Sequence, residues 1–166
     1  MEIYTVAFFG HRYIDNFSRA ENGVESIVRD LLNSHEYVDF LIGRDGDFDQ
    51  IVSSTVKRMK RAIRDDNSSL TWVLPYPTAE LENNHEDYEN YYDNIEICEE
   101  SCNAHFKGAI QMRNKSMVDR ADLVVCFIDH SSGGAYQTVK YAEKQNKKII
   151  NIADEDMKWN RLNGKN

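Results

Sequence analysis

Three short glycine-containing stretches of this sequence combine residue types that bind phosphate groups. They are Gly10-His11-Arg12, Gly43-Arg44-Asp45-Gly46 and Ser132-Gly133-Gly134. Glycines let the backbone approach a ligand closely, and an arginine guanidinium donates two parallel hydrogen bonds to a phosphate. Before a helix, free N–H groups and the helix dipole also favour an anion. Each stretch alone is an ordinary turn, so the prediction of an anion site depends on their meeting in space.

Each of these stretches follows an apolar run that predicts a β-strand, at residues 3–9, 37–42 and 123–128. The last run is apolar on every side, which favours a buried parallel strand with a crossover helix. Further strands are predicted at 70–74 and 148–152, with a weak peripheral strand at 92–97. Helical periodicity predicts helices over 18–33, 48–63 and 104–120, and one more after Gly134. Capping boxes are expected at Ser18 with Glu21 and at Asp47 with Gln50.

Strands that alternate with helices predict an α/β fold, with three layers and a mostly parallel, Rossmann-like sheet of about five to six strands. We expect helices on both faces and a single domain over residues 1–166. Ligands of such sheets bind beyond the carboxyl ends of the strands, where the strand order reverses. The three glycine-containing stretches are therefore expected to meet at one rim, with Arg12 and Arg44 facing the same ligand.

The net charge of −8 is unevenly distributed. Nine of the 28 acidic residues lie in residues 78–100, which lack Lys and Arg, and the remaining 19 nearly balance the 20 Lys and Arg. We expect this acidic insertion to be a solvated, partly irregular surface. One helical face is basic, and we also expect it to be solvated rather than bound to a polyanion; its residues are Lys57, Arg58, Lys60, Arg61 and Arg64. Residues 154–166 form a polar tail, apart from Met157, Trp159 and Leu162.

The odd number of cysteines, three, and the place of Cys126 in a core strand predict reduced thiols. Cys98, Cys102 and His105 lie close in sequence, but no second Cys/His pair completes a zinc site, so we expect no metal. No apolar run approaches the roughly 20 residues of a membrane span. The N-terminus does not resemble a signal peptide. A cytoplasmic protein is expected.

Four motifs together resemble the SLOG superfamily, the Rossmann-like group of the DprA/Smf and lonely-guy proteins, and most of all its YpsA-like branch. They are the GHR motif at residues 10–12, GRDGD at 43–47, RNxxMVDxxD at 113–122 and SSGGAxxTVxYA at 131–142. The resemblance covers the chain to about Ile152. It implies a site for nucleotides or nucleotide derivatives, including ADP-ribose-type molecules, with no resident cofactor. The implied ligand-binding residues are Gly10, His11, Arg12, Gly43, Arg44, Gly46, Arg113, Asn114, Ser132, Gly133, Gly134 and Thr138.

One departure from the family pattern bears on catalysis. Lonely-guy phosphoribohydrolases carry PGGxGTxxE, whose glutamate belongs to the catalytic site. In this sequence Lys140 occupies the position of that glutamate, and Tyr136-Gln137 replace the Gly-Thr pair. Cleavage of an N-glycosidic bond needs a carboxylate near the ribose. The sequence therefore favours ligand binding over turnover.

Three functions remain as alternatives. The favoured one is a module that senses or sequesters a nucleotide or ADP-ribose-like ligand. The second is an N-glycosidic hydrolase or transferase acting on nucleoside monophosphates, with His11 as acid or base and a carboxylate from Asp45, Asp47, Asp119 or Asp122. The third is a single-stranded DNA binder, for which we expect no binding at physiological salt.

Other residues allow weaker expectations. Ser131 and Ser132 follow His130 but are not expected to form a nucleophile with it, because neighbours on an extended loop point apart. Tyr88, Tyr91 and Tyr92 are expected to cover the core or a dimer face, which leaves a homo-oligomer open. No membrane partner is expected.

Overall fold

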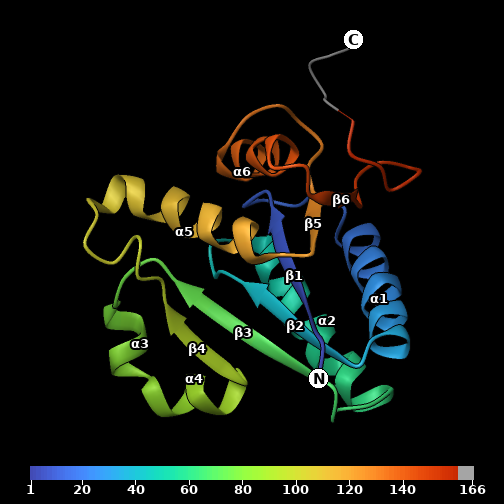
Figure 1. Cartoon of the computed structure of the whole chain (residues 1–166), viewed down its shortest axis with the longest axis horizontal. Coiled ribbons are helices and arrows are strands. Elements are labelled where there is room, and N and C mark those ends of the chain that lie inside the picture. The colour runs from blue at the N-terminus through green and yellow to red at the C-terminus, as the bar shows by residue number, and fades with distance from the viewer. Residues whose placement is uncertain (161–166) are drawn as a thin grey trace.

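The computed structural model of the chain describes residues 1–160, which form a six-stranded sheet with helices on both faces (Figure 1). The strands are β1 (Ile3–Gly10), β2 (Tyr37–Ile42), β3 (Ser68–Leu74), β4 (Asn94–Ile97), β5 (Leu123–Phe127) and β6 (Lys148–Asn151). The helices are α1 (Phe17–Ser34), α2 (Asp47–Ala62), α3 (Ala79–Asn83), α4 (His85–Tyr91), α5 (Phe106–Arg120) and α6 (Gly134–Lys144). The predicted strands and long helices are all present, with ends that shift by at most two residues.

The strand order is β4-β3-β2-β1-β5-β6, and every neighbouring pair is parallel. The chain builds outward from β1 to β4, and α5 then returns it to β5 on the other side of β1. The order therefore reverses between β1 and β5. This is the place where open α/β sheets bind ligands, beyond the carboxyl ends of the strands. The α/β, Rossmann-like prediction is confirmed.

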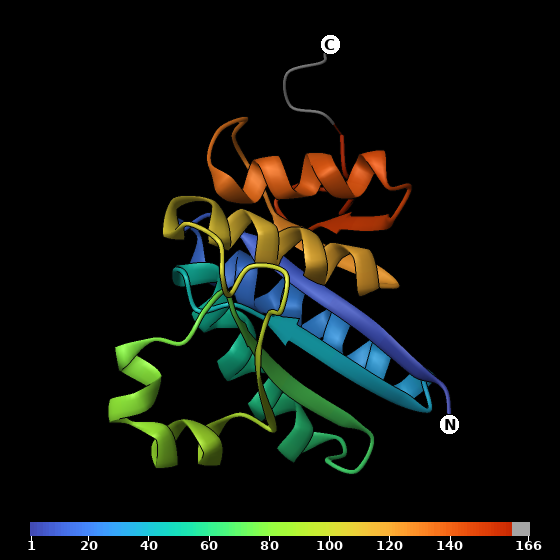
Figure 2. The same ribbon diagram turned by 60° about the vertical axis from the view of Figure 1, so that its left-hand side comes forward.

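The core has two parts, one on each face of the sheet. Val6 and Phe8 of β1 pack in the cluster that α1 and α2 cover, and Ala7 and Phe9 pack in the cluster under α5 and α6. This division follows from the strand period, since successive side chains of a strand point to opposite faces. Figure 2 shows α5 and α6 on one side of the sheet and α1 and α2 on the other. Strands buried on both faces explain the continuous apolar runs of the sequence.

Both predicted capping boxes are wrong. Helix α1 begins one residue before Ser18, and the side chain of Asn16 accepts a hydrogen bond from Arg19 N at 3.1 Å. Helix α2 has Gly46 at its N-cap position, and Asp47 is the first helical residue. The Asp47 carboxylate instead accepts a hydrogen bond from Ile14 N at 3.0 Å. A contact between distant residues has displaced the local cap, and it fixes the loop after β1 to the start of α2.

The acidic insertion is more ordered than expected. It contains α3, α4 and the edge strand β4, which confirms the weak strand predicted there. Tyr88 and Tyr91 pack against the core, and Trp72 lies against Tyr88 with a ring-centroid distance of 5.2 Å. Several acidic groups form ion pairs with cations of the body, at Glu80–Arg44, Asp93–Lys60 and Glu96–Arg120.

The basic face of α2 uses most of its cations inside the protein. Arg58 pairs with Glu25 at 2.6 Å, Arg64 with Asp66 at 2.8 Å, and Lys57 donates to the Tyr91 carbonyl at 2.8 Å. These contacts leave little of that face for a polyanion.

Other features of the sequence have definite places. Of the tail residues, Met157 and Trp159 pack against the two core clusters, while Leu162 lies outside the described residues. The three cysteines are free thiols, and burial raises the pKa of Cys126. Among the helices of residues 1–160, none is both long and apolar enough to cross a membrane.

A buried amide fixes the chain where β5 ends. Asn151 is 2% exposed; its Oδ1 accepts from Ile128 N at 2.9 Å, and its Nδ2 donates to Ile128 O at 3.0 Å. Asn151→Ala should lower the free energy of unfolding by about 3 kcal/mol, because both buried backbone groups lose their partner. Urea denaturation measures this change. Asn22→Ala, at an exposed position of α1, is the control and should change stability by less than about 0.5 kcal/mol. Equal effects of the two variants would contradict the assignment.

Candidate functional site

A cavity of about 350 Å³ lies at the carboxyl ends of β1 and β5, at the reversal of the strand order. It brings together eight of the residues implied by the sequence: Gly10, His11, Arg12, Gly43, Asn114, Ser132, Gly133 and Gly134. The rest of its lining is Phe8, Phe9, Tyr13, Asp45, Asp49, Ile110, Gln111, His130 and Ala135. All three glycine-containing stretches contribute to this one cavity.

The loop after β1 presents an unpaired cation. The backbone carbonyl of Arg12 accepts a hydrogen bond from Asp47 N at 2.8 Å, which holds the loop on α2. Gly46 permits this approach, since a Cβ there would lie 2.5 Å from the Arg12 Cα. The Arg12 side chain is exposed and has no hydrogen bond or ion pair with any residue of 1–160. Its backbone is therefore fixed while its guanidinium is available to a ligand.

The opposite wall is the N-terminal turn of α6. Gly133 has a φ of +95°, a conformation that side chains other than glycine adopt only with strain. The N–H groups in the first turn of a helix have no intrahelical partners, and Gly134 and Ala135 of this turn line the cavity. The Gly134 carbonyl is held by Gln111 Nε2 at 3.2 Å and by Thr138 Oγ1 at 3.0 Å. The turn is thus supported from α5 and from its own helix.

Arg113 is buried behind the cavity and does not line it. Its side chain is only 1% exposed, donates to Val73 O at 2.9 Å and to Asn114 Oδ1 at 3.0 Å, and forms an ion pair with Asp45. Asn114 in turn donates to Thr138 Oγ1 at 3.1 Å. Arg113 and Thr138 were expected to bind the ligand directly, but they lie behind the residues that face the cavity. Gly46 likewise supports Arg12 and does not line the cavity.

Arg44 does not meet the expectation that it faces the cavity beside Arg12. Its guanidinium turns toward the acidic insertion, where it donates to Glu80 at 3.3 Å and to the Tyr92 hydroxyl at 3.3 Å. It also lies over the rings of Trp72 and Tyr88, at 5.7 and 5.0 Å from their centroids. An arginine stacked on aromatic rings is held by cation–π attraction and by its hydrogen bonds. Arg44 therefore fastens the insertion to the sheet.

A pair of carboxylates lies on the α2 side of the cavity. Asp45 N donates a hydrogen bond to Asp49 Oδ2 at 2.9 Å, and both side chains line the cavity. Burial raises the pKa of Asp49 to about 7, and the nearby Asp45 carboxylate adds to the rise, while the Asp45 N–H and Arg113 oppose it. Asp49 can therefore hold a proton near neutral pH. Of the four carboxylates expected at the site, only Asp45 lines the cavity. The other three accept hydrogen bonds elsewhere: Asp47 from Ile14 N, Asp119 from the Tyr141 hydroxyl, and Asp122 from Thr5 N.

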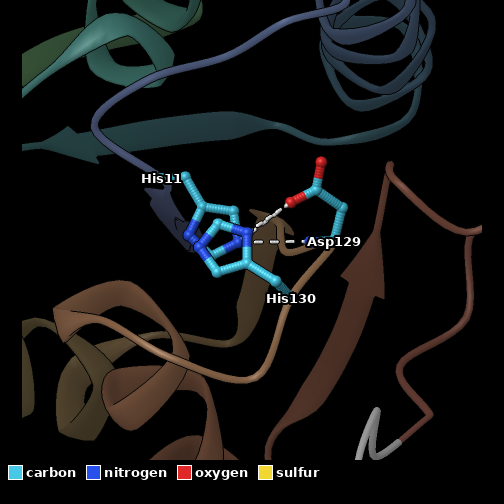
Figure 3. Close-up of side chains that lie close together, drawn as sticks. All are labelled: His11, Asp129 and His130. Atoms are coloured by element: carbon cyan, nitrogen blue, oxygen red, sulfur yellow. Dashed lines mark hydrogen bonds and ion pairs between the residues drawn. The ribbon is translucent and has the colours of Figure 1, made fainter.

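Two histidines stack at the junction of the β1 and β5 loops (Figure 3). The rings of His11 and His130 lie 3.5 Å apart with an interplanar angle of 10°. Asp129 Oδ1 lies 3.3 Å from His11 Nε2 and 2.7 Å from His130 Nδ1. The Asp129 N–H donates to His11 Nε2 at 3.2 Å. Burial lowers the pKa of His11, the neighbouring His130 lowers it further, and Asp129 opposes both.

The sequence did not identify Asp49, Gln111 or the His11–Asp129–His130 cluster. A signal existed for the first two: Asp49 is four residues after Asp45, and Gln111 is three residues before Asn114, which places it on the same face of α5. No signal existed for the cluster, because it depends on which two strands are neighbours in the sheet.

No protein-family model and no curated protein matches the sequence. Solved structures match in fold. The DNA processing protein A (DprA) of Streptococcus pneumoniae superposes with a TM-score of 0.63 at 14% identity, over 89% of this chain and 49% of that one. DprA of Helicobacter pylori, described for its single-stranded DNA binding mode, superposes with a TM-score of 0.59 at 15% identity, over 88% of this chain and 63% of that one. The molybdenum cofactor carrier protein of Chlamydomonas reinhardtii superposes with a TM-score of 0.57 at 13% identity, over 90% of this chain and 76% of that one.

This chain shares the Rossmann-like fold of these solved structures. It spans about half the length of the pneumococcal DprA and under two thirds of the Helicobacter protein. At these identities the likeness concerns the arrangement of strands and helices and not the ligand.

The protonation of Asp49 predicts a pH-dependent stability. Its pKa of about 7 in the folded chain exceeds the ordinary value of 3.8, so the native state keeps a proton that the unfolded chain has released. The wild type should therefore lose stability as pH rises from about 4 to 7, by on the order of 2 kcal/mol relative to Asp49→Asn. Urea denaturation of both proteins between pH 4 and pH 8 measures the difference. Asp65→Asn, at an exposed position, controls for net charge, and a constant difference between wild type and Asp49→Asn would contradict the assignment.

Proposed function

We propose that this protein binds a nucleotide or a nucleotide derivative of the ADP-ribose type, through phosphate groups held between Arg12 and the first turn of α6. The observation that carries the proposal is that Arg12, whose guanidinium has no partner among residues 1–160, and the N-terminal turn at Gly133-Gly134 line the same cavity. Fixed N–H groups, a helix dipole and a free arginine together suit an anion. The motifs shared with the YpsA-like branch support the same ligand class.

The cavity also has surfaces for the uncharged part of such a ligand. Its volume of about 350 Å³ lies at the lower end of small-molecule sites, roughly 300–1,000 Å³, which suits one nucleotide unit. Phe9 and Ile110 contribute apolar lining. Tyr13, at the mouth, is 80% exposed, and a base can stack on its ring.

A small ligand fits the charge distribution better than single-stranded DNA does. Binding of a strand requires a basic groove with aromatic platforms along it. The basic face of α2 is occupied by internal ion pairs, such as Arg58–Glu25 and Lys60–Asp93. The Helicobacter pylori DprA is also longer than this chain and only 15% identical to it, so its single-stranded DNA binding is no guide to the ligand of this chain.

Replacement of Arg12 tests the proposal. Arg12→Gln should weaken binding of ADP and ADP-ribose by about 10- to 100-fold, the worth of a charge-assisted hydrogen bond to phosphate. Isothermal titration calorimetry measures the affinities. Thermal stability should not change, because the Arg12 side chain has no partner among residues 1–160.

Two arginines serve as matched controls. Arg61→Gln removes the same charge from an exposed position of α2 and should leave affinity within about twofold. Arg44→Gln should lower stability through its lost contacts with Tyr92 and Glu80 rather than remove a phosphate contact. Absence of binding to any nucleotide, or equal losses in Arg12→Gln and Arg61→Gln, would contradict the proposal.

A second candidate function rests on the carboxylate pair. Asp49, with a pKa of about 7 in the cavity, can donate a proton to a leaving base or accept one from water, and Asp45 beside it can stabilise positive charge on the ribose. Asp45 and Asp49 would thus supply the carboxylate that is missing at Lys140, the position of the catalytic glutamate in lonely-guy phosphoribohydrolases. Hydrolysis or transfer at the N-glycosidic bond of a nucleoside monophosphate is therefore the alternative.

Chromatography separates the two functions. Under the first proposal, nucleoside monophosphates incubated with the protein release no free base. Under the second, the wild type releases base, and Asp49→Asn slows the release by about 100-fold or more, as expected on loss of a general acid. Release that persists unchanged in Asp49→Asn would exclude this carboxylate.

A further inference from the structure

The His11–Asp129–His130 cluster has the chemistry of a metal site. Its side-chain ligand atoms, one from each residue, all lie within 4.8 Å of one another. The 3.3 Å from Asp129 Oδ1 to His11 Nε2 is close to the spacing of neighbouring ligands on one small ion, and the 2.7 Å to His130 Nδ1 is a hydrogen bond that an ion would replace. It is the one such group of His, Cys, Asp and Glu found within residues 1–160.

The position of the His11 ring also suits a metal. Its Nε2 lies 3.2 Å from Asp129 N and 3.3 Å from Asp129 Oδ1, so a ring nitrogen of His11 faces the backbone and the carboxylate of Asp129. The His130 ring stacks on the His11 ring at 3.5 Å between centroids. The cluster therefore places two imidazoles and one carboxylate together, and these are the groups that bind transition metals.

We propose that His11, Asp129 and His130 bind one divalent transition-metal ion at the edge of the ligand cavity. Two imidazoles and one carboxylate suit Zn²⁺, Ni²⁺, Co²⁺ or Fe²⁺, whereas Mg²⁺ and Ca²⁺ prefer sites built of oxygen. The residues come from the loops after β1 and β5, so the ion joins the two strands between which the strand order reverses.

Binding requires a rearrangement that the structure permits. The lone pairs of stacked rings run parallel, but a single ion needs them to converge, so one ring has to leave the stack. His11 is 6% exposed and stays in place, whereas the side chain of His130 is 55% exposed. Residues 129–134 are all exposed, which leaves this loop free to turn His130 about Asp129. The ion then replaces the 3.2 Å hydrogen bond from Asp129 N at His11 Nε2.

Three protein ligands leave at least one coordination position open. His11 and His130 both line the cavity, so an open position there faces the ligand space. A phosphate oxygen is a suitable occupant, and the ion adds positive charge beside Arg12. This last step rests on the proposed nucleotide function, while the metal site itself does not.

Metal titration of the chelator-treated, full-length protein tests the site. Calorimetry with Zn²⁺ should give a stoichiometry of one ion per chain. Titration with Co²⁺ should give visible d–d absorption bands of an ion bound by imidazole nitrogens. His130→Ala and Asp129→Asn should each weaken Zn²⁺ binding by about tenfold or more. Both positions are exposed, so neither variant threatens the fold. Imidazole NMR should show the ring resonances of His11 and His130 shifting together with the first equivalent of metal.

His85→Ala is the matched control. His85 lies 3.3 Å from Glu89 on α4, a histidine–carboxylate pair far from the cavity lining, and its loss should leave the affinity unchanged. Equal weakening in His85→Ala and His130→Ala, absence of a one-to-one step, or resonances of His11 that do not move would overturn the proposal as adventitious binding.

Nucleotide titrations with and without chelator separate the two proposals. ADP binding that survives chelation, together with no stoichiometric Zn²⁺ binding, overturns the metal site and leaves the nucleotide function standing. Stoichiometric Zn²⁺ binding without ADP binding overturns the nucleotide function and leaves the metal site.

Discussion

A buried guanidinium organises the ligand end of this molecule. Arg113 is 1% exposed, and an arginine cannot shed its charge, so every donor must find an acceptor inside the protein. Its partners are the Val73 carbonyl at the end of β3, the Asn114 amide on α5 and the Asp45 carboxylate after β2. One side chain thus ties three elements together. The position of the loop after β2, and with it one side of the cavity, depends on that pairing.

The same pairing allows acids and an anion site to share one cavity. Asp45 is compensated by Arg113, and Asp49 holds a proton near neutral pH, so the carboxylate pair carries less net negative charge than its composition suggests. The first turn of α6 on the opposite wall, and Arg12 in the loop that lies on the start of α2, bring positive potential to the same cavity. The phosphate of the proposed ligand would meet these groups.

The sequence predicted the frame of this structure well because the frame depends on periodicity. Fully apolar runs such as Leu123–Phe127 identify strands covered on both faces, and the glycine stretches after them identify the rim. The metal-competent cluster could not be found this way, since His11 and Asp129 meet only because β5 is the neighbour of β1. Nor could the N-terminus of α2, because Asp47 bonds to Ile14, a residue 33 positions away, and does not cap its own helix.

Arginines were the least predictable residues for a similar reason. Arg44 and Arg12 each follow a glycine after a strand, so local sequence treats them alike. Trp72, Tyr88 and Tyr92 of β3 and the acidic insertion decide the matter, because they offer Arg44 aromatic faces and a hydroxyl. Arg12 has no hydrogen-bond, ion-pair or ring partner for its guanidinium within residues 1–160, and it lines the cavity.

The different surroundings of Arg44 and Arg12 also explain how a chain with a net charge of −8 can have a site suited to an anion. Charges separated by more than about 8 Å of physiological salt solution are largely screened, so the potential at a cavity depends on the groups that line it. Three carboxylates of the acidic insertion form ion pairs with cations of the body, namely Glu80 with Arg44, Asp93 with Lys60 and Glu96 with Arg120. These cations belong to the loop after β2, to α2 and to α5, and none of the three lines the cavity. Beside Asp45 and Asp49, the cavity keeps a helix terminus and an arginine that has no side-chain partner within residues 1–160, and the local field of these two groups would favour an anion.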